Sequence, residues 1–220
     1  MELMQWLIEI DEKLLLAING CHNDYFDHFM YLFSDRWIWV PMYVAILYVM
    51  IRNFSFRKTV VCLIAIALTI TIADQVGASL IRPIVERMRP SNPDNPISDL
   101  VHIVNNHRSG RYGFPSCHAA NTFGLAFFVC FLFRRRWLTV FLMFWAVVTC
   151  YSRVYLGLHY PGDLFFGMIL GFLSAVVVYF VMRKLIGEHC ESRLRHVNAP
   201  ICVGALTIVV ISLISPFMQF

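Results

Sequence analysis

The residues best suited to chemistry lie in the segment 151–163, where Arg153, His159 and Asp163 interrupt an otherwise apolar stretch. Charged and titratable side chains beside membrane-like sequence are costly to desolvate, so they are expected to have partners and a function. Asp163 follows His159 by four residues, which across a helix start brings the carboxylate one turn below the imidazole. If one ring nitrogen donates to Asp163, the other keeps a free lone pair, as a histidine nucleophile requires.

Two upstream segments, each at the edge of an apolar run, supply partners for this one. The first carries Arg82 and Arg89, and the second, residues 115–118, reads Pro-Ser-Cys-His. Displacement at a phosphate ester spreads negative charge over the equatorial oxygens, so its catalysis depends mainly on electrostatic clamping and positioning. Arg82, Arg89 and Arg153 suit such a clamp because each guanidinium can bind two oxygens and stays charged.

The segment 115–118 opens an apolar run, so free backbone amides and the positive end of a helix dipole would point toward a bound phosphoryl oxygen. The Ser116 hydroxyl and the Cys117 amide would each add a hydrogen bond. The thiol of Cys117 stands beside His118, which makes it an alternative nucleophile.

In order and internal spacing, the three segments together resemble the signature of the type 2 phosphatidic acid phosphatase superfamily. The matching residues are Arg82-x6-Arg89-Pro90, Pro115-Ser116-Cys117-His118 and Ser152-Arg153-x5-His159-x3-Asp163. Arg82 stands where lysine is commonest, and Cys117 stands where glycine is usual. Because the arginine keeps the charge and the cysteine keeps the amide donor, neither departure changes the reaction class.

The resemblance implies a metal-independent and cofactor-independent phosphatase. In the family, the histidine matched by His159 attacks phosphorus to form a phosphohistidine, and that matched by His118 protonates the leaving alkoxide and then activates water. Asp163 would fix the tautomer of His159, and the thiol of Cys117 would take no part. The phosphate-binding residues would be Arg82, Arg89, Ser116, Cys117 and Arg153.

Composition indicates an integral membrane protein. The chain has 220 residues, which fits one domain, and 59% are hydrophobic against 15% charged, with a mean hydropathy of +0.64. The net charge of +4 is spread over short loops, which leaves no basic stripe for a nucleic acid. The first residues are acidic instead of basic, so we expect no cleaved signal peptide.

The expected fold is all-α, with six transmembrane helices and an N-terminal amphipathic helix over residues 3–18 at the membrane interface. A short segment packed on the bundle is the alternative for residues 3–18. The longest polar stretch is an outer loop over residues 85–117. Each apolar run is near the ~20 residues needed to cross a bilayer. The runs are about 37–52, 58–81, 118–133, 137–156, 163–182 and 199–218.

Basic residues would gather on one side of the membrane if the six spans alternate. They are Arg52, Arg57, Lys58, Arg134, Arg135, Arg136, Arg183, Lys184, Arg193 and Arg195. By the positive-inside rule that side is cytoplasmic. The outer loop and the 153–162 turn then face the extracytoplasmic or periplasmic side of a multi-pass cell (inner) membrane protein.

The second apolar run carries a polar stripe of Thr71, Gln75, Ser79 and Arg82, with Asp74 close to it. We expect the stripe to face the bundle interior. Hydrogen bonding between helices is one interpretation, and proton or substrate handling at Asp74 is another. In the fifth apolar run, Gly167, Gly171 and the nearby Ser174 repeat on one helix face, which favours close helix packing within the bundle over dimerisation.

The expected partners are a lipid phosphate substrate and membrane lipids, with the oligomeric state left open. Phosphatidic acid, phosphatidylglycerol phosphate, polyprenyl diphosphate and lipid A phosphates all fit the site. His107, Arg108 and Arg111 in the outer loop are candidates to bind a second phosphate or a sugar head group. A lipid phosphotransferase would use the same site residues, and a lipid or ion transporter is the non-enzymatic alternative.

Overall fold

The computed structural model describes residues 2–187 and 194–218, and within these ranges the regular elements are helices without a β-strand. The predicted all-α fold is therefore confirmed. The helices are α1 (Glu2–Asn19), α2 (Asp24–Ser34), α3 (Val40–Asn53), α4 (Phe56–Gln75), α5 (Arg82–Val85), α6 (Cys117–Phe133), α7 (Arg136–Tyr155), α8 (Pro161–Ile186) and α9 (Ala199–Ile214).

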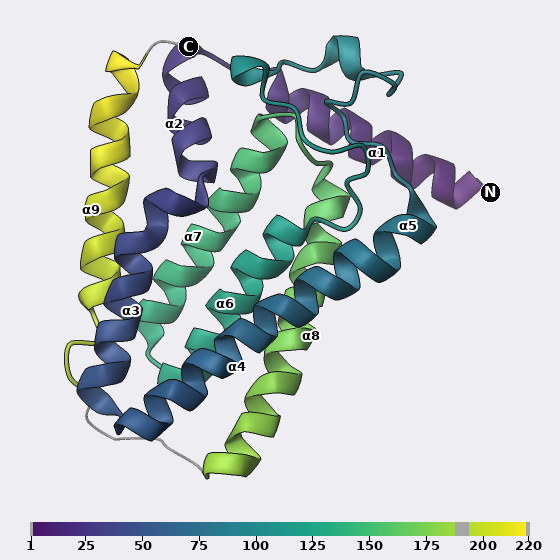
Figure 1. Ribbon diagram of the computed structural model, residues 1–220. Helices are drawn as coiled ribbons and strands as arrows, with labels where there is room; N and C mark the ends of the chain where they lie inside the picture. The colour runs from purple at the N-terminus through teal and green to yellow at the C-terminus, as the bar shows by residue number, and fades with distance from the viewer. Residues whose placement is uncertain (1, 188–193, 219–220) are drawn as a thin grey trace.

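The long helices run side by side along the bundle, while α1 and the loop between α5 and α6 cover one end of it (Figure 1). Helix α6 packs against α4, α7 and α8, and α9 packs against α3. Small residues allow the close approach of α6 and α8: a Cβ atom at Gly167 would lie 2.4 Å from the Ser116 carbonyl oxygen, and one at Gly171 would lie 2.3 Å from that of Ala120. The predicted close packing at these glycines is confirmed.

Among the residues that the structure describes, four helical segments are long and apolar enough to cross a membrane. They are Phe56–Val85, Arg136–Tyr155, Pro161–Ile186 and Ala199–Phe217. Helix α6 is shorter, with 17 residues, and α3 has 14. These elements lie within a few residues of the predicted spans, and six crossings remain a prediction.

The N-terminal segment forms the helix α1, which contacts α7 and α8. Its Leu15 is fully buried, while Leu3 and Leu7 are exposed. Location of α1 at the membrane interface stays a prediction. Its packing on the bundle, the alternative considered for this segment, is observed.

The expectation that the polar stripe faces the interior is wrong for Thr71, Gln75 and Ser79, which are exposed. The Ser79 hydroxyl donates to Gln75 Oε1 over 3.1 Å, so this polar pair is satisfied within its own helix. Asp74 points inward and accepts from Asn121 Nδ2 on α6 at 3.2 Å. The π-helical turn at Val76–Ile81 separates these residues from Arg82, which turns toward the start of α6, where its Nη2 lies 3.2 Å from the Pro115 carbonyl oxygen.

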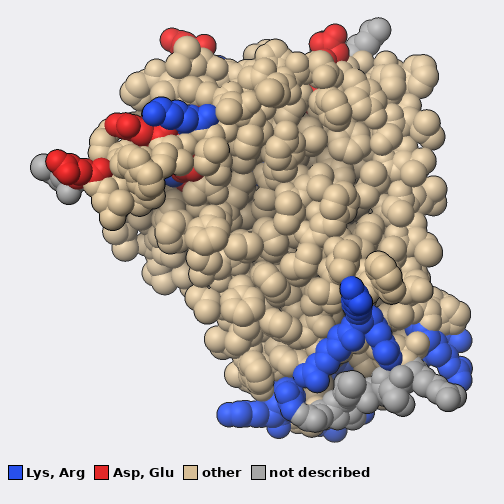
Figure 2. Space-filling view, turned by 180° about the vertical axis from the view of Figure 1, so that it is seen from behind, with Lys and Arg blue, Asp and Glu red and all other residues tan. Residues whose placement is uncertain are grey.

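Charge is divided between the two ends of the molecule. Figure 2 shows lysine and arginine gathered at one end and acidic side chains at the other. The basic end is formed by the α3–α4 and α6–α7 connections and the end of α8 (Figure 1). Arg193, one of the residues used to predict orientation, lies outside the described residues.

Candidate active site

The three signature segments meet at the end of the bundle that α1 and the loop cover. A tight turn after α7 brings the chain back into α8, and Gly157 adopts φ +67° within it. A Cβ atom there would also lie 2.3 Å from Val101 Cγ1 of the loop, so the turn requires glycine. His159 follows this turn and enters the bundle end directly before α8.

His159 is 1% exposed and sits between a carboxylate and a guanidinium. Its Nδ1 lies 3.3 Å from Asp163 Oδ2, and its Nε2 lies 2.6 Å from Arg89 Nη1. Because a guanidinium only donates hydrogen bonds, Nε2 is the acceptor and Nδ1 carries the hydrogen toward Asp163. The lone pair on Nε2 is thus the reactive group that this geometry presents.

Burial, followed by the positive charges of Arg89, Arg153 and Arg82, holds the pKa of His159 well below its usual range. The imidazole is therefore neutral at neutral pH. Burial and then the charge of Arg82 lower the pKa of Arg89 to about 10, so Arg89 stays cationic at the same pH. The site combines a neutral base with a buried positive charge, which suits an incoming anion.

Asp163 is fully buried and has two partners besides His159. Its Oδ2 accepts from the Tyr160 amide at 3.1 Å, and its Oδ1 lies 3.0 Å from Arg87 Nη1. The same Arg87 nitrogen lies 2.6 Å from Asp11 Oδ2 on α1, and its guanidinium stacks 3.8 Å above the Tyr160 ring. Three groups therefore hold the carboxylate in place.

Asp11 also joins α1 to the start of α8, because its Oδ1 accepts from the Gly162 amide at 2.7 Å. Sequence reasoning missed both Arg87 and Asp11. Arg87 is not one of the signature residues, and only its place two residues before Arg89 could have indicated a role in the site. Asp11 gave none, since an acidic residue on an amphipathic helix is ordinarily solvated.

The start of α6 brings Arg82, Ser116 and Cys117 together. Ser116 is fully buried, its hydroxyl accepts from the Ala119 amide at 3.3 Å, and its own amide donates to the Asp163 carbonyl at 3.0 Å. The Ser116 side chain thus caps α6. Arg82 Nη2 lies 3.0 Å from Cys117 Sγ and 3.2 Å from the Pro115 carbonyl oxygen, so Arg82 is held against the same helix start.

His118 and Arg153 line a polar cavity of about 380 Å³. Within the described part of the chain, His118 Nε2 and Arg153 Nε are buried without a hydrogen-bond partner, while Arg153 Nη1 donates to Ser34 Oγ at 2.8 Å. Buried polar groups that lack partners beside a cavity are ready to bind a ligand. The cavity is lined by Tyr31, Ser34, Asp35, Arg36, His107, His118, Arg153 and Leu156.

A second cavity of about 440 Å³ adjoins the first and lies among α3, α4, α6 and α7. The two share Ser34, Arg36 and His118 as lining residues. The walls of the second are mainly apolar, with Trp39 and Trp145 among them. A polar cavity that opens into an apolar one matches a ligand with a charged head and a hydrocarbon tail.

Of the three loop residues predicted to bind a head group, only His107 lines the polar cavity. Burial, then the charge of Arg153, lowers the pKa of His107. Arg108 instead donates to the Ser91 carbonyl, and Arg111 lies exposed, 4.0 Å from Asp94. The cation that does line both cavities is Arg36, which stands just before the first apolar run and was not singled out from the sequence.

Comparisons with known proteins agree with this geometry. The chain matches the PAP2 superfamily over residues 61–186. It is 53% identical over 183 residues to a lipid A 4′-phosphatase of Bacteroides thetaiotaomicron, covering 83% of this chain and 81% of the relative. It is 32% identical over 196 residues to a lipid A 4′-phosphatase of Porphyromonas gingivalis, covering 86% and 81%.

Two solved structures share the fold. A PAP2-type phosphatidylglycerolphosphate phosphatase of Bacillus subtilis superposes with a TM-score of 0.59 at 20% identity, covering 85% of this chain and 89% of that one. LpxE of Aquifex aeolicus superposes with a TM-score of 0.53 at 22% identity, covering 76% and 92%. With its apolar helices, its three signature segments folded together and a family match over more than half its length, this chain is an integral membrane protein that belongs to the PAP2 superfamily.

Proposed function

We propose that this protein, a membrane lipid phosphatase, hydrolyses the 4′-phosphate of lipid A through a phosphohistidine on His159. The observation that carries the chemistry is the buried His159, whose Nδ1 faces Asp163 and whose Nε2 accepts from Arg89. The choice of lipid A rests on the names of the two relatives, which are 53% and 32% identical to this chain.

In the first step the substrate phosphate takes the place of His159 Nε2 as the partner of Arg89. Arg89, Arg82 and Arg153 then bind the phosphoryl oxygens, and the Nε2 lone pair attacks phosphorus. The bond between phosphorus and the sugar oxygen breaks, and its electron pair leaves on that oxygen. Protonated His118 supplies the proton that completes the leaving hydroxyl.

In the second step His118, now neutral, accepts a proton from water. The resulting hydroxide attacks phosphorus, the bond between phosphorus and nitrogen breaks, and its electron pair returns to His159 Nε2. Inorganic phosphate leaves. In both steps Asp163 accepts a hydrogen bond from Nδ1–H of His159 and stabilises the positive charge that develops on the imidazole. Asp163 therefore acts by positioning and electrostatics.

The two adjoining cavities fit a lipid. We infer that the phosphate binds between His159 and the wall of the polar cavity formed by His118 and Arg153, with Arg36 and His107 near the head group. An acyl chain would enter the apolar cavity. We also infer a single membrane-embedded domain with six crossings. The basic end would be cytoplasmic under the positive-inside rule, and the site would then face the extracytoplasmic side.

A phosphate-release panel on purified protein in detergent tests this proposal. The substrates are lipid A with 1- and 4′-phosphates, phosphatidic acid, phosphatidylglycerol phosphate and polyprenyl diphosphate. Among these substrates lipid A should have the highest kcat/KM for phosphate release. Mass spectrometry of its product should show that the 4′-phosphate has been lost. Preference for another lipid would overturn the substrate assignment, and strict dependence on an acceptor lipid would indicate a phosphotransferase.

Variants test the mechanism separately from the substrate. His159→Ala and His118→Ala should abolish turnover, and acid-labile phosphate labelling of the protein should be absent from His159→Ala. Asp163→Asn should remain folded while kcat falls by about 10²–10⁴-fold through loss of tautomer control. Full activity of His159→Ala would falsify the nucleophile assignment, and transport that survives this variant would support the transporter alternative.

A further inference from the structure

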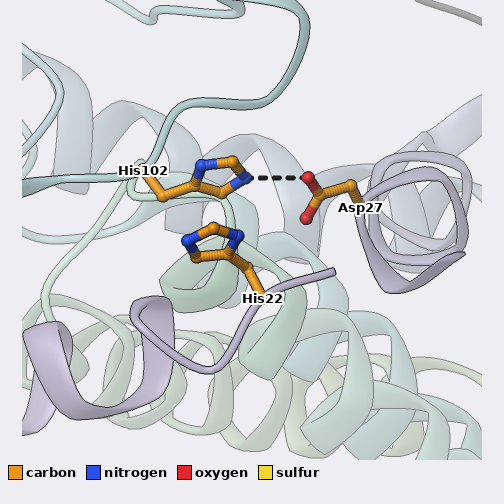
Figure 3. A group of neighbouring side chains, drawn as sticks. All are labelled: His22, Asp27 and His102. Carbon is orange, nitrogen blue, oxygen red and sulfur yellow. Dashed lines mark hydrogen bonds and ion pairs between the residues drawn. The ribbon is translucent and has the colours of Figure 1, made fainter. Parts of the chain in front are cut away.

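Two histidines and an aspartate from separate segments converge near the end of the bundle that carries the site (Figure 3). His22 lies in the α1–α2 connection, Asp27 on α2 and His102 in the loop between α5 and α6. One ligand atom from each of the three residues lies within 4.8 Å of the others. His102 Nε2 is 2.8 Å from Asp27 Oδ2, and the two imidazole rings stack with centroids 3.6 Å apart.

Outer hydrogen bonds hold the backbone of His102 and the carboxylate of Asp27 in place before any ligand arrives. The His102 amide donates to Asn19 Oδ1 at 2.8 Å, and its carbonyl accepts from Asn19 Nδ2 at 2.9 Å. Asp27 Oδ1 accepts from the Tyr155 hydroxyl at 2.6 Å, which leaves Oδ2 to face His102. Such outer-shell bonds orient the donors in metal sites and raise their affinity for the ion.

The third group, His22, is exposed and lies on a short connection between two helices, so its ring can turn. Its ring is parallel to that of His102 within 4°. Figure 3 shows that each ring carries a nitrogen on the side of Asp27. A tetrahedral zinc ion with ligands at about 2.0–2.1 Å keeps ligand atoms about 3.3 Å apart. To close the site, the His22 ring must therefore leave its stack on His102, and the 2.8 Å contact between His102 Nε2 and Asp27 Oδ2 must widen.

We propose that His22, Asp27 and His102 form a binding site for one divalent transition-metal ion of the zinc class, with water as a fourth ligand. Two imidazole nitrogens and one carboxylate oxygen suit zinc, whereas calcium and magnesium prefer oxygen donors alone. The ion would tie α2 and the α1–α2 connection to the loop that carries His107. None of the three residues lines either cavity, so we expect the ion to have a structural role.

Zinc binding by the full-length protein in detergent tests the site. After treatment with a chelator and its removal, we expect one zinc ion to bind per chain when zinc is measured by mass spectrometry and titration calorimetry. Zinc at 100-fold above its Kd stabilises the folded state by about 2.7 kcal/mol, which raises Tm by about 5 °C or more. Asp27→Asn and His102→Gln should weaken binding by about 10–100-fold or more.

The most informative variant is His22→Ala, because it leaves the bond between His102 and Asp27 intact and removes one ligand. It should weaken zinc binding by about 10-fold or more and abolish the zinc-dependent rise in Tm. His196→Ala, an exposed histidine in the connection before α9, is the matched control and should bind zinc like the wild type. Equal zinc binding by wild type and His22→Ala would overturn the proposal and leave a hydrogen-bonded cluster without metal.

Phosphatase activity separates this inference from the proposed function. With zinc removed, the enzyme should keep its kcat at temperatures well below the lowered Tm. Loss of activity on chelation in both the wild type and His22→Ala would place a required metal elsewhere and contradict the metal-independent mechanism, whereas equal zinc binding by these two proteins would contradict the zinc site alone. Loss of zinc binding in His22→Ala with unchanged kcat supports the structural site.

Discussion

Replacing Arg87 by glutamine should lower kcat by about 30–150-fold with little change in KM. Arg87 Nη1 lies 3.0 Å from Asp163 Oδ1, and two unit charges at that separation attract by about 5.5 kcal/mol at an effective dielectric constant of 20. The Arg87 side chain is 22% exposed, so solvent screening reduces the net contribution to about 2–3 kcal/mol. At 1.4 kcal/mol for each factor of ten, a loss of this size in the transition state gives the expected range.

The assay is initial-rate phosphate release in detergent, together with Tm and the pH dependence of kcat/KM. KM should stay within about threefold, because Arg87 is paired with Asp11 and Asp163 and has no assigned contact with the substrate. Removing a positive charge near His159 should also move the acid limb of the kcat/KM profile to higher pH. Arg57→Gln, an exposed arginine at the opposite end of the molecule, is the control and should leave all three measurements unchanged.

A double-mutant cycle with Asp11 decides whether α1 acts through Arg87. Asp11→Asn removes the charge next to Arg87, while the asparagine oxygen can still accept from the Gly162 amide. Alone it should lower kcat by about 2–5-fold, and in the Arg87→Gln background it should add almost nothing. Full kcat in Arg87→Gln, or additive losses in the double variant, would refute the chain of contacts from Asp11 to Asp163.

Further predictions concern the head group, the thiol and pH. Arg36→Gln should raise KM for a diphosphorylated lipid by about 10-fold, because a charged hydrogen bond is lost. The double variant Arg108→Ala, Arg111→Ala should change KM by less than about threefold, since contacts within the loop hold both side chains. A larger rise in KM for the double variant than for Arg36→Gln would show that the loop binds the head group. Cys117→Ser should keep at least about a third of the initial rate, and an inactive variant would make the thiol a participant. Because the pKa of His159 is well below its usual range, single-turnover phosphohistidine formation should not fall between about pH 7.5 and 6, and a fall would contradict a neutral buried imidazole.

The same depressed pKa carries a prediction about stability. Below about pH 6.5 the unfolded chain takes up a proton on His159 that the folded chain does not bind. The folded state therefore loses stability as the pH falls from about 6.5 toward the lowered pKa. Tm measured across this range should decline less in His159→Gln than in the wild type. An equal decline in both would contradict this linkage.

The sequence by itself determined the reaction class and the helical elements of this protein. A long apolar run by itself predicts a helix that avoids water. The four-residue spacing of His159 and Asp163 predicts their contact because both residues belong to one local turn into α8. The glycines at 167 and 171 likewise predicted close packing from spacing along a single helix. Each of these inferences depends on neighbours in the chain, where backbone geometry leaves few alternatives.

Only the tertiary structure decided which distant groups support the site. Asp163 meets Arg87 across 76 positions, and His102 meets Asp27 across 75. Thr71 and Gln75 face outward because the packing of α4 against α6 and α8 decides which side of the helix is buried, and helical spacing alone does not contain that choice. Arg36 lines both cavities, whereas Arg108 and Arg111 contact other residues of the loop. Contacts between segments far apart in the chain depend on how the helices pack, and a local pattern does not contain that information.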